Sequence, residues 1–329
     1  MENKEKIQKK HSKLKIFFLF ILIIVILLLV GVVIGYSFVN SKLDKIQYED
    51  IDVNTIEITE GVEENLSQFR NIVLFGVVDA DGYRGRSDCI IIFSINENTK
   101  EVKMTSVYRD TYVEVPNHGF TKINHAYAYG GAGVAMSTIN RNLDLDIKEY
   151  ATINFNVVKD VVDYVGGVEI NVTSAEVSHI PAVTKAGTQT LNGTQALAYG
   201  RIRYIDSDYK RTERMRTVIN AVFNKVKKMS VTEMNNFANK ILPEIHTNIP
   251  KSEITKVMTD VPNYNIGSSI GWPYEVSGKM LDGVYYAVPK TLQDAVQKLH
   301  IELFEETDYQ TTETVNNISS TITKKTGVK

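Results

Sequence analysis

The hydrophobic pattern of the chain opens with one uninterrupted apolar run, Ile16–Phe38, which holds no charged residue. A run of this length exceeds the roughly 20 apolar residues with which a helix spans a bilayer. Residues 1–15, before the run, carry six lysines and two glutamates, whereas residues 39–67, after it, are polar and acidic. Because positive flanking charge stays on the cytoplasmic side, the pattern predicts a transmembrane helix over residues 16–38 that follows a cytoplasmic tail.

A cleaved signal peptide is the alternative interpretation of this N-terminal segment. The apolar run is too long for the central region of a signal peptide, and no cleavage site with small residues follows it. The pattern therefore favours an uncleaved anchor that crosses the cell membrane once. Residues 39–67 are then predicted to form an extracellular stalk, and the rest of the chain to lie outside the cell.

Beyond the stalk, short apolar runs alternate with segments of helical spacing over residues 68–305. Residues 71–77 and 89–95 are almost continuously apolar, which is typical of central strands covered on both faces. Further strands are predicted at residues 101–107, 111–115, 150–155, 168–172 and 283–288. Helices are predicted at residues 134–143, 157–165, 194–199, 211–228, 230–241, 253–260 and 292–304. This alternation favours an α/β fold, layered α-β-α around a central mixed β-sheet and preceded by one transmembrane helix.

The C-terminal segment, residues 306–329, is rich in Thr, Ser and Asn. It offers little apolar surface to bury, and burial is what offsets the entropy of ordering a chain. The composition therefore predicts a disordered tail.

Six basic residues are concentrated in residues 201–216 and are interleaved with acids. They are Arg201, Arg203, Lys210, Arg211, Arg214 and Arg216. Arg201 and Arg203 lie two apart, so in extended backbone both side chains point to one side. Arg211 falls on the apolar stripe of the helix that follows, where a cation needs an acid or an anionic ligand. The planar guanidinium group suits phosphate oxygens, and the pattern therefore indicates a polyphosphate or pyrophosphate site. A solvated helix face with surface ion pairs is the alternative.

Composition excludes several other classes of function. The formal net charge of -2 argues against a protein that binds nucleic acid electrostatically. The single cysteine, Cys89, cannot form an intrachain disulfide and lies in an apolar run, so we expect a core residue. Neither a P-loop nor a GxSxG nucleophile motif is present.

Acidic and basic residues also occur at the ends of the predicted strands. Asp79 follows the first strand, Asp88 precedes the second, and Arg109 and Asp110 follow the third. If the first two strands are antiparallel neighbours, Asp79 and Asp88 lie close together. Two carboxylates beside phosphate-binding arginines are the oxygen ligands expected for Mg²⁺, which also binds substrate phosphates. Taken singly, Asp79, Asp88 and Arg109 are each more typical of a turn or a surface ion pair than of a ligand site.

Seven segments in this order give the chain a resemblance to a known family: NIVLFGVVDA, GRSDCIII, SVYRDTYV, KINHAYAYGG, VDYVGGVEINV, LNGTQALAYGRIRY and DYKRTER. Over roughly residues 70–228 the sequence resembles the LytR-CpsA-Psr (LCP) family. The resemblance implies a phosphotransferase of the bacterial cell envelope. Such an enzyme moves a glycopolymer, for example wall teichoic acid or capsule, from an undecaprenyl-pyrophosphate carrier to the muramic acid 6-hydroxyl of peptidoglycan.

The resemblance also implies roles for individual residues. The pyrophosphate-binding, catalytic arginines would be Arg86, Arg109, Arg201, Arg203 and Arg211. The carboxylates that bind Mg²⁺ would be Asp79 and Asp88, and Asp208 matches the acid that precedes the helix arginine by three positions. Met215 stands where many members of the family have Gln, so a polar contact made there by the relatives is absent in this chain.

These expectations combine into one mechanism. The arginines clamp the pyrophosphate, an acceptor hydroxyl attacks the phosphorus nearer the glycan, and undecaprenyl phosphate leaves. Asp208 or Asp110 orients the arginines or accepts the hydroxyl proton, and the membrane anchor raises the local concentration of the lipid carrier. The apolar stripes of residues 157–165 and 215–226 either line a cavity for the lipid tail or form ordinary core.

Three other functions remain as alternatives. A membrane-bound attenuator of cell-envelope genes would require contact with DNA, and a scaffold would bind glycan without turnover. A lipid-pyrophosphate hydrolase would differ from the transferase only in using water as the acceptor.

Overall fold

A seven-stranded mixed β-sheet forms the centre of the computed structural model, which describes residues 46–77, 85–203, 205–206 and 208–329. The strands, in spatial order, are β1 (Gln47–Tyr48), β10 (His246–Thr247), β7 (Glu149–Asn154), β2 (Phe69–Val77), β3 (Ser87–Asn96), β4 (Glu101–Val107) and β11 (Asn265–Trp272). Strands β2, β3 and β4 are antiparallel neighbours, whereas β7 pairs parallel with β2 and β11 pairs parallel with β4. The predicted mixed sheet is confirmed.

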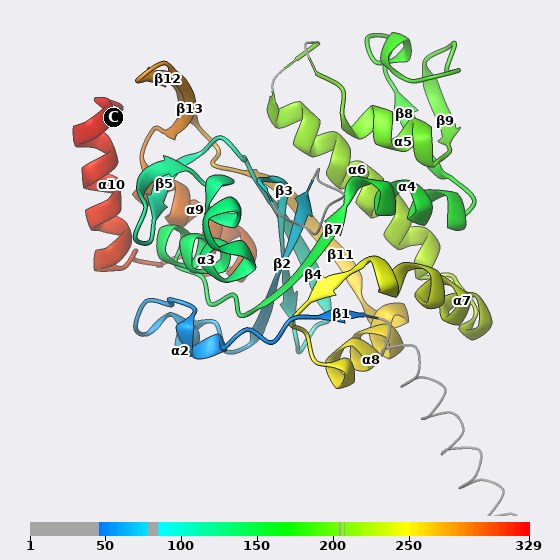
Figure 1. The fold of residues 1–329 in the computed structure, drawn as a ribbon, viewed down its shortest axis with the longest axis horizontal. Helices are drawn as coiled ribbons and strands as arrows, with labels where there is room; N and C mark the ends of the chain where they lie inside the picture. The colour runs from blue at the N-terminus through cyan, green and yellow to red at the C-terminus, as the bar shows by residue number, and fades with distance from the viewer. Residues whose placement is uncertain (1–45, 78–84, 204, 207) are drawn as a thin grey trace, which may run out of the picture. The chain divides into compact units, whose positions relative to one another are not determined.

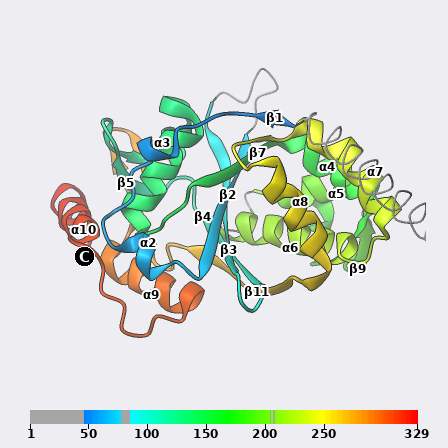
Figure 2. The same ribbon diagram turned by 90° about the horizontal axis from the view of Figure 1, so that it is seen from below.

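Helices cover both faces of this sheet, as Figure 2 shows. On one face lie α3 (His125–Leu143) and α9 (Leu292–Phe304), which pack on Phe75 and Ile92 in the main core. On the other lie α6 (Asp208–Val226) and α8 (Lys251–Asp260), which pack on side chains of β3 and β4. Residues 90–92 of β3 are fully or almost fully buried, because the two layers enclose the strand from both sides. The predicted α-β-α layering is confirmed.

A smaller core lies beside the α6 face (Figure 1). It is formed by α4 (Phe155–Tyr164), the hairpin of β8 (Val168–Val172) and β9 (Gly187–Leu191), α5 (Gly193–Gly200) and one side of α6. Val162, Leu191 and Val218 are fully buried there. This core fixes the end of α5 against α6, and the segment between these two helices carries Arg201 and Arg203.

The remaining elements lie outside the central sheet. They are α2 (Val62–Asn65), the hairpin of β5 (Tyr112–Val115) and β6 (Gly119–Lys122), α7 (Val231–Ile241), the hairpin of β12 (Val276–Leu281) and β13 (Val284–Pro289), and α10 (Glu313–Thr326). The strands predicted at residues 111–115, 168–172 and 283–288 are thus present, but as members of two-stranded hairpins.

The glycine cluster of residues 130–133 does not precede a helix, as the sequence suggested. Helix α3 begins at His125 and is broken in its course at Gly130 and Gly131. Gly131 has φ 63° and ψ −153°, a backbone conformation that only glycine adopts without strain. The glycines therefore turn the helix axis.

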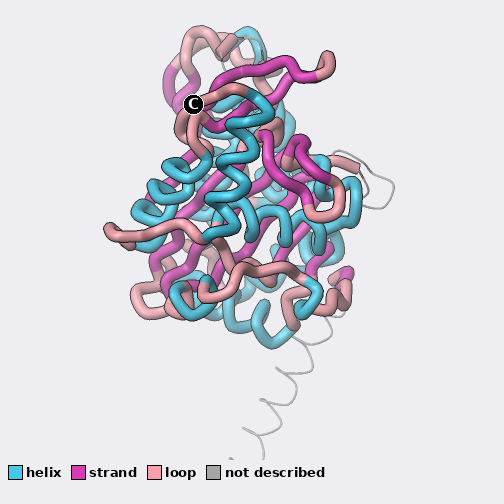
Figure 3. Tube along the Cα trace, turned by 90° about the vertical axis from the view of Figure 1, so that its left-hand side faces the viewer, coloured by secondary structure: helices cyan, strands magenta, loops and turns pink. Residues whose placement is uncertain are grey.

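Two predicted domain boundaries are wrong. Residues 46–67 are not a stalk, because the compact unit starts at Ile46, β1 pairs with β10, and Val62 and Leu66 are buried in the main core. The C-terminal segment is not disordered, because α10 buries Val315, Ile318 and Ile322 against the same core. Spacings of three and four put these few apolar residues on one face of a helix. Figure 3 shows the helix that leads to the C-terminus, α10, on the side of the molecule that faces the viewer.

The predictions for the N-terminus fall outside the described residues. The cytoplasmic tail (1–15), the transmembrane helix (16–38) and the start of the stalk belong to this part of the chain. Within residues 46–77, 85–203, 205–206 and 208–329, no helix combines the length and the apolar character that crossing a bilayer requires.

The attachment of α10 depends on one buried carboxylate, Asp144. Its oxygens accept hydrogen bonds from the Tyr309 hydroxyl at 2.9 Å, from the Thr312 backbone N–H at 2.9 Å and from the Thr312 hydroxyl at 2.6 Å. Asp144 is fully buried and has φ 50°, a conformation that Asn also tolerates. The substitution Asp144→Asn therefore changes the hydrogen bonds without straining the backbone.

We expect Asp144→Asn to lower the free energy of unfolding by about 1–3 kcal/mol, because an amide NH₂ then faces buried donors. Urea denaturation measures this loss, and hydrogen exchange in residues 305–329 should accelerate. Asp308→Asn is the control, because this side chain is exposed and the structure, where it describes the chain, gives it no hydrogen bond. Equal stability of the two variants would show that Asp144 does not hold α10.

Candidate active site

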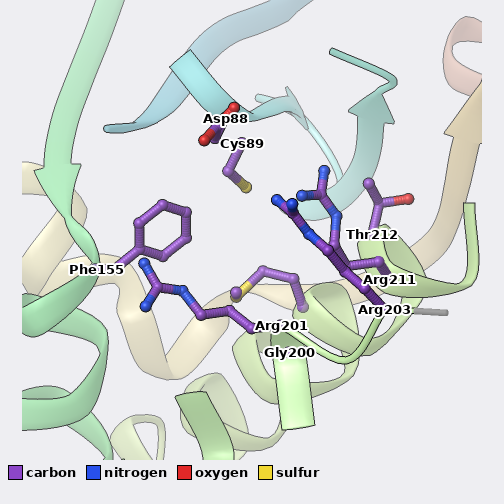
Figure 4. Close-up of a pocket in the computed structure, with 9 residues that line it drawn as sticks. Asp88, Cys89, Phe155, Gly200, Arg201, Arg203, Arg211 and Thr212 are labelled. Atoms are coloured by element: carbon purple, nitrogen blue, oxygen red, sulfur yellow. The ribbon is translucent and has the colours of Figure 1, made fainter. Parts of the chain in front are cut away.

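A cavity of about 360 Å³ lies where β3 begins, between the end of the sheet and helix α6. Its lining combines cations, one carboxylate and apolar or sulfur-containing side chains. The lining residues are Asp88, Cys89, Phe155, Gly200, Arg201, Arg203, Arg211, Thr212 and Met215. Figure 4 shows the guanidinium groups of Arg203 and Arg211 near each other on one side of this cavity. The structure therefore brings together four of the site residues predicted from the sequence.

Arg201 and Arg203 come from the segment that follows α5. The Asn192 and Gln195 capping box starts this helix, and Arg201 terminates it. The segment is not the extended strand that we expected. Ile202 is nevertheless buried while both arginines are exposed, so the two arginine side chains still lie on the side opposite to Ile202. The Arg201 guanidinium lies over the Phe155 ring at 4.5 Å, a cation–π contact that holds it at the cavity wall.

Arg211 enters the cavity from the first turns of α6 and is only 8% exposed. It lies on the inward stripe of the helix, as its spacing from Met215 and Val218 predicted. Gly200 allows the end of α5 to approach this helix, because a Cβ at position 200 would lie 2.8 Å from the Met215 methyl group. Close packing of the two helices thus places the three arginines around one space.

Arg109 does not line the cavity, but it is hydrogen-bonded to Asp88, which does. Its Nη1 donates to Asp88 Oδ1 at 2.8 Å, and its Nε donates to Asp110 Oδ2 at 3.4 Å. Lys122 Nζ donates to the other Asp110 oxygen at 2.6 Å. Asp110 therefore orients Arg109. We did not single out Lys122 from the sequence, where a lone Lys in a short strand gives no distinguishing signal.

The remaining predicted site residues are less closely grouped. Arg86 is exposed and does not line the cavity. Asp79 lies outside the described residues, as does the side chain of Asp208, whose backbone starts α6. Within the described parts of the chain, no group of three His, Cys, Asp or Glu residues could hold a metal ion by itself.

Cys89 lines the cavity and is not the enclosed core residue that we expected. Burial raises the pKa of its thiol to about 11, and Arg211 and Arg216 only partly oppose this shift. The thiol is therefore protonated at neutral pH, which argues against a nucleophilic role. Sequence reasoning gave no reason to place it beside the arginines.

Arg216 adds a further cation behind the cavity wall. It is 6% exposed, and its Nε and Nη1 have no hydrogen-bond partner among the described residues. Burial lowers the pKa of its guanidinium, although the nearby Tyr108, Glu213 and Cys89 oppose the shift. With Arg201, Arg203 and Arg211 around one carboxylate, Asp88, this part of the molecule favours an anionic ligand.

A buried ion-pair network fixes the segment that carries the arginines. Arg214 Nε donates to Glu176 at 2.6 Å, and both of its terminal nitrogens donate to the Asp206 carboxylate. Arg214 is 5% exposed and points away from the cavity. It therefore ties the segment after Arg203 to α6 and to the β8–β9 side of the molecule. In the sequence it was indistinguishable from the ligand-binding arginines.

His125, at the start of α3, lies near Arg86, Lys122 and Asp110. Its Nδ1 is 2.9 Å from the Thr121 hydroxyl, and its buried Nε2 has no partner among the described residues. Burial lowers the pKa of its imidazole, and the neighbouring Arg86 and Lys122 lower it further, while Asp110 opposes them. The ring is therefore neutral at pH 7.

Comparison with known proteins decides the family. The model of the LytR_cpsA_psr family matches residues 33–302, which is most of the chain. The chain belongs to this family. An LCP relative from Enterococcus faecalis, named polyisoprenyl-teichoic acid–peptidoglycan teichoic acid transferase TagU, is 34% identical over 260 residues, covering 76% of this chain and 83% of that protein. A TagU from Bacillus cereus is 32% identical, covering 82% and 90%. The prediction of a phosphotransferase is confirmed.

Solved structures of LCP proteins share the fold. TagT bound to LIIa-WTA superposes with a TM-score of 0.63 at 29% identity, covering 73% of this chain and 91% of that chain. The LCP protein YwtF (TagT) with bound octaprenyl pyrophosphate lipid gives a TM-score of 0.58 at 26% identity, with the same coverage. The second of these proteins binds a polyisoprenyl pyrophosphate.

The lowered pKa of His125 makes stability depend on pH. Above about pH 6.5 the imidazole is neutral in both the folded and the unfolded chain. Below this pH the unfolded chain binds a proton that the folded chain resists, so stability falls as pH falls, by at most about 1.4 kcal/mol per pH unit. We expect His125→Gln to reduce this loss, measured as urea midpoints from about pH 7.5 to 5. His179→Gln, at an exposed site, is the control; identical profiles for wild type and His125→Gln would contradict the prediction.

Proposed function

We propose that this chain transfers a glycopolymer, a wall teichoic acid or capsule-like polymer, from an undecaprenyl-pyrophosphate carrier to peptidoglycan. The observation that carries the proposal is the convergence of Arg201, Arg203 and Arg211 on one cavity that also contains Asp88. Planar guanidinium groups bind phosphate oxygens through paired hydrogen bonds. The three arginines and Asp88 together carry a charge of about +2, which matches the two negative charges of a pyrophosphate diester. The names of the TagU relatives support teichoic acid as the polymer.

The reaction requires positioning and charge neutralisation more than covalent help from the protein. The acceptor hydroxyl oxygen forms a bond to the phosphorus nearer the glycan, and the bond from this phosphorus to the bridging oxygen breaks. Undecaprenyl phosphate leaves with the negative charge, which the arginines stabilise. Both oxygens of Asp110 are already engaged by Arg109 and Lys122, so we assign the acceptor proton to Asp208.

Mg²⁺ fits this site as a partner of the substrate. The ion is commonly bound by one or two carboxylates together with substrate phosphates and water, and Asp88 supplies one carboxylate at the cavity. Asp79 is the second proposed ligand. When bound, Mg²⁺ would neutralise charge on the pyrophosphate oxygens.

We also propose that residues 16–38 anchor the chain in the cell membrane, with the folded unit on the outer side. The apolar run and the lysines before it support this topology. The lipid carrier is itself confined to the membrane, so anchoring raises the concentration of enzyme near substrate.

The deciding experiment incubates the purified full-length protein with Mg²⁺, a lipid-pyrophosphate-linked glycan and peptidoglycan oligomers. Mass spectrometry of the products separates three outcomes. Glycan phosphate on peptidoglycan supports the transferase, release of free glycan phosphate shows a hydrolase, and unchanged substrate shows a binding protein. The last two outcomes would overturn the proposal.

We expect Arg203→Ala to reduce transfer by about 100-fold, because one charge-assisted contact to a developing phosphate charge is lost. The fold should persist, since the Arg203 side chain is exposed. Lys210→Ala removes an exposed cation of the same region, whose partner among the described residues is Glu213, and is the matched control. Equal activity of the two variants in the transfer assay would refute the assigned role of Arg203.

The Mg²⁺ proposal is tested by binding rather than turnover. Titration calorimetry with inorganic pyrophosphate should give an affinity at least about tenfold higher with Mg²⁺ than with a chelator. This gain should disappear in Asp88→Asn and persist in Asp308→Asn, whose site is exposed and lies outside the cavity lining. A gain of the same size in Asp88→Asn would exclude Asp88 as a ligand.

A further inference from the structure

Two aromatic rings, eleven positions apart in the sequence, stack on the molecular surface on the α3 side of the sheet. Tyr129, in α3, is 46% exposed, and its ring lies 4.3 Å from the His118 ring at an interplanar angle of 15°. His118 is also exposed, in the turn between β5 and β6. The backbone is irregular beside both rings. Helix α3 is broken directly after Tyr129, and the two residues that flank His118 have positive φ.

This aromatic pair is joined to the active site by a continuous line of contacts. The Tyr129 ring meets the His125 ring edge-on at 6.1 Å, and His125 contacts Thr121. Lys122, the next residue, bonds Asp110, which holds Arg109 against Asp88 at the cavity. The pair therefore lies at the outer end of a chain of contacts that reaches Asp88 in the cavity.

The aromatic pair and the cavity arginines lie on opposite faces of the central sheet. Helix α3 covers one face of the sheet, whereas α6 and its arginines lie on the opposite face. In phosphoryl transfer the attacking and leaving oxygens lie roughly in line on opposite sides of the phosphorus. If the arginines hold the leaving phosphate on the α6 side, the acceptor must arrive from the α3 side.

We propose that Tyr129 and His118 bind the glycan strand of the acceptor, which rests on the transferase function proposed above. One face of a pyranose ring presents C–H groups that pack on an aromatic ring, while its hydroxyl groups remain in water. A stacked, half-exposed pair of rings suits such a sugar better than it suits a protein partner, because it offers little enclosed apolar area. Sugar units bound there place a neighbouring hydroxyl toward the cavity that Asp88 lines.

The test uses the purified full-length protein and soluble peptidoglycan glycan strands, without any donor lipid. We expect Tyr129→Ala to weaken glycan binding about three- to tenfold, since one aromatic contact is lost. Tyr129→Trp, which keeps an aromatic face, should bind within about twofold of wild type. Tyr285→Ala, which removes a tyrosine that is 47% exposed on the β12–β13 hairpin, is the matched control and should leave binding unchanged.

Transfer kinetics provide the second measurement. Tyr129→Ala should raise KM for the peptidoglycan acceptor and leave KM for the lipid-linked donor unchanged. Unchanged glycan binding in Tyr129→Ala, or an equal loss in Tyr285→Ala, overturns the proposal, as does a rise confined to the donor KM, which would place the donor glycan there. If the wild type transfers nothing, the proposed function fails, while the binding measurement still decides whether Tyr129 holds a glycan.

Discussion

The structure depends on holding several guanidinium groups close together without letting their mutual repulsion push them apart. At separations of a few ångströms, like charges repel by about 4 kcal/mol at an effective dielectric constant of 20. The chain counters this with local partners. Arg109 lies between Asp88 and Asp110, Arg214 between Glu176 and Asp206, and Arg201 over the Phe155 ring. Positive charge nevertheless remains in excess around the cavity, and an anionic ligand completes the balance.

These partners come from distant parts of the sequence, so the site exists only when the whole fold has formed. The antiparallel pairing of β2 and β3 puts Ser87 opposite Val77, and Asp88 follows at the start of β3. The small core around Val162 and Val218 presses α5 against α6 and so brings Arg201 toward Arg211. Stability of this minor core and electrostatics of the cavity are therefore coupled, although its side chains never contact the ligand site.

The sequence allowed the central sheet, the layers and four cavity residues to be predicted, because strong apolar runs and the arginine stretch give local signals. It did not allow the roles within that stretch to be separated. Arg211 lines the cavity, whereas Arg214, three positions later, is paired with Glu176 and Asp206. Only tertiary packing decides which face of α6 meets which neighbour. Helix α10 was missed for a related reason: its three core residues are diluted by Thr and Ser, and Asp144, which anchors it, lies far away in the chain. The two-residue strand β1 was also missed, because its pairing with β10 lies far away in the sequence.

The packing of α4 and α6 bears on where a lipid tail could bind. The sequence left the stripes of α4 and α6 open as either a tail cavity or core, and in the described structure Val162 and Val218 are fully buried core residues. A cavity of about 360 Å³ suits a pyrophosphate and the first part of a tail, not a long isoprenoid chain. Met215 lines the cavity beside the arginines. Its side chain is flexible and adapts readily to a new shape. Met215 can move aside for an apolar group without leaving a buried amide unpaired, as a Gln at this position would.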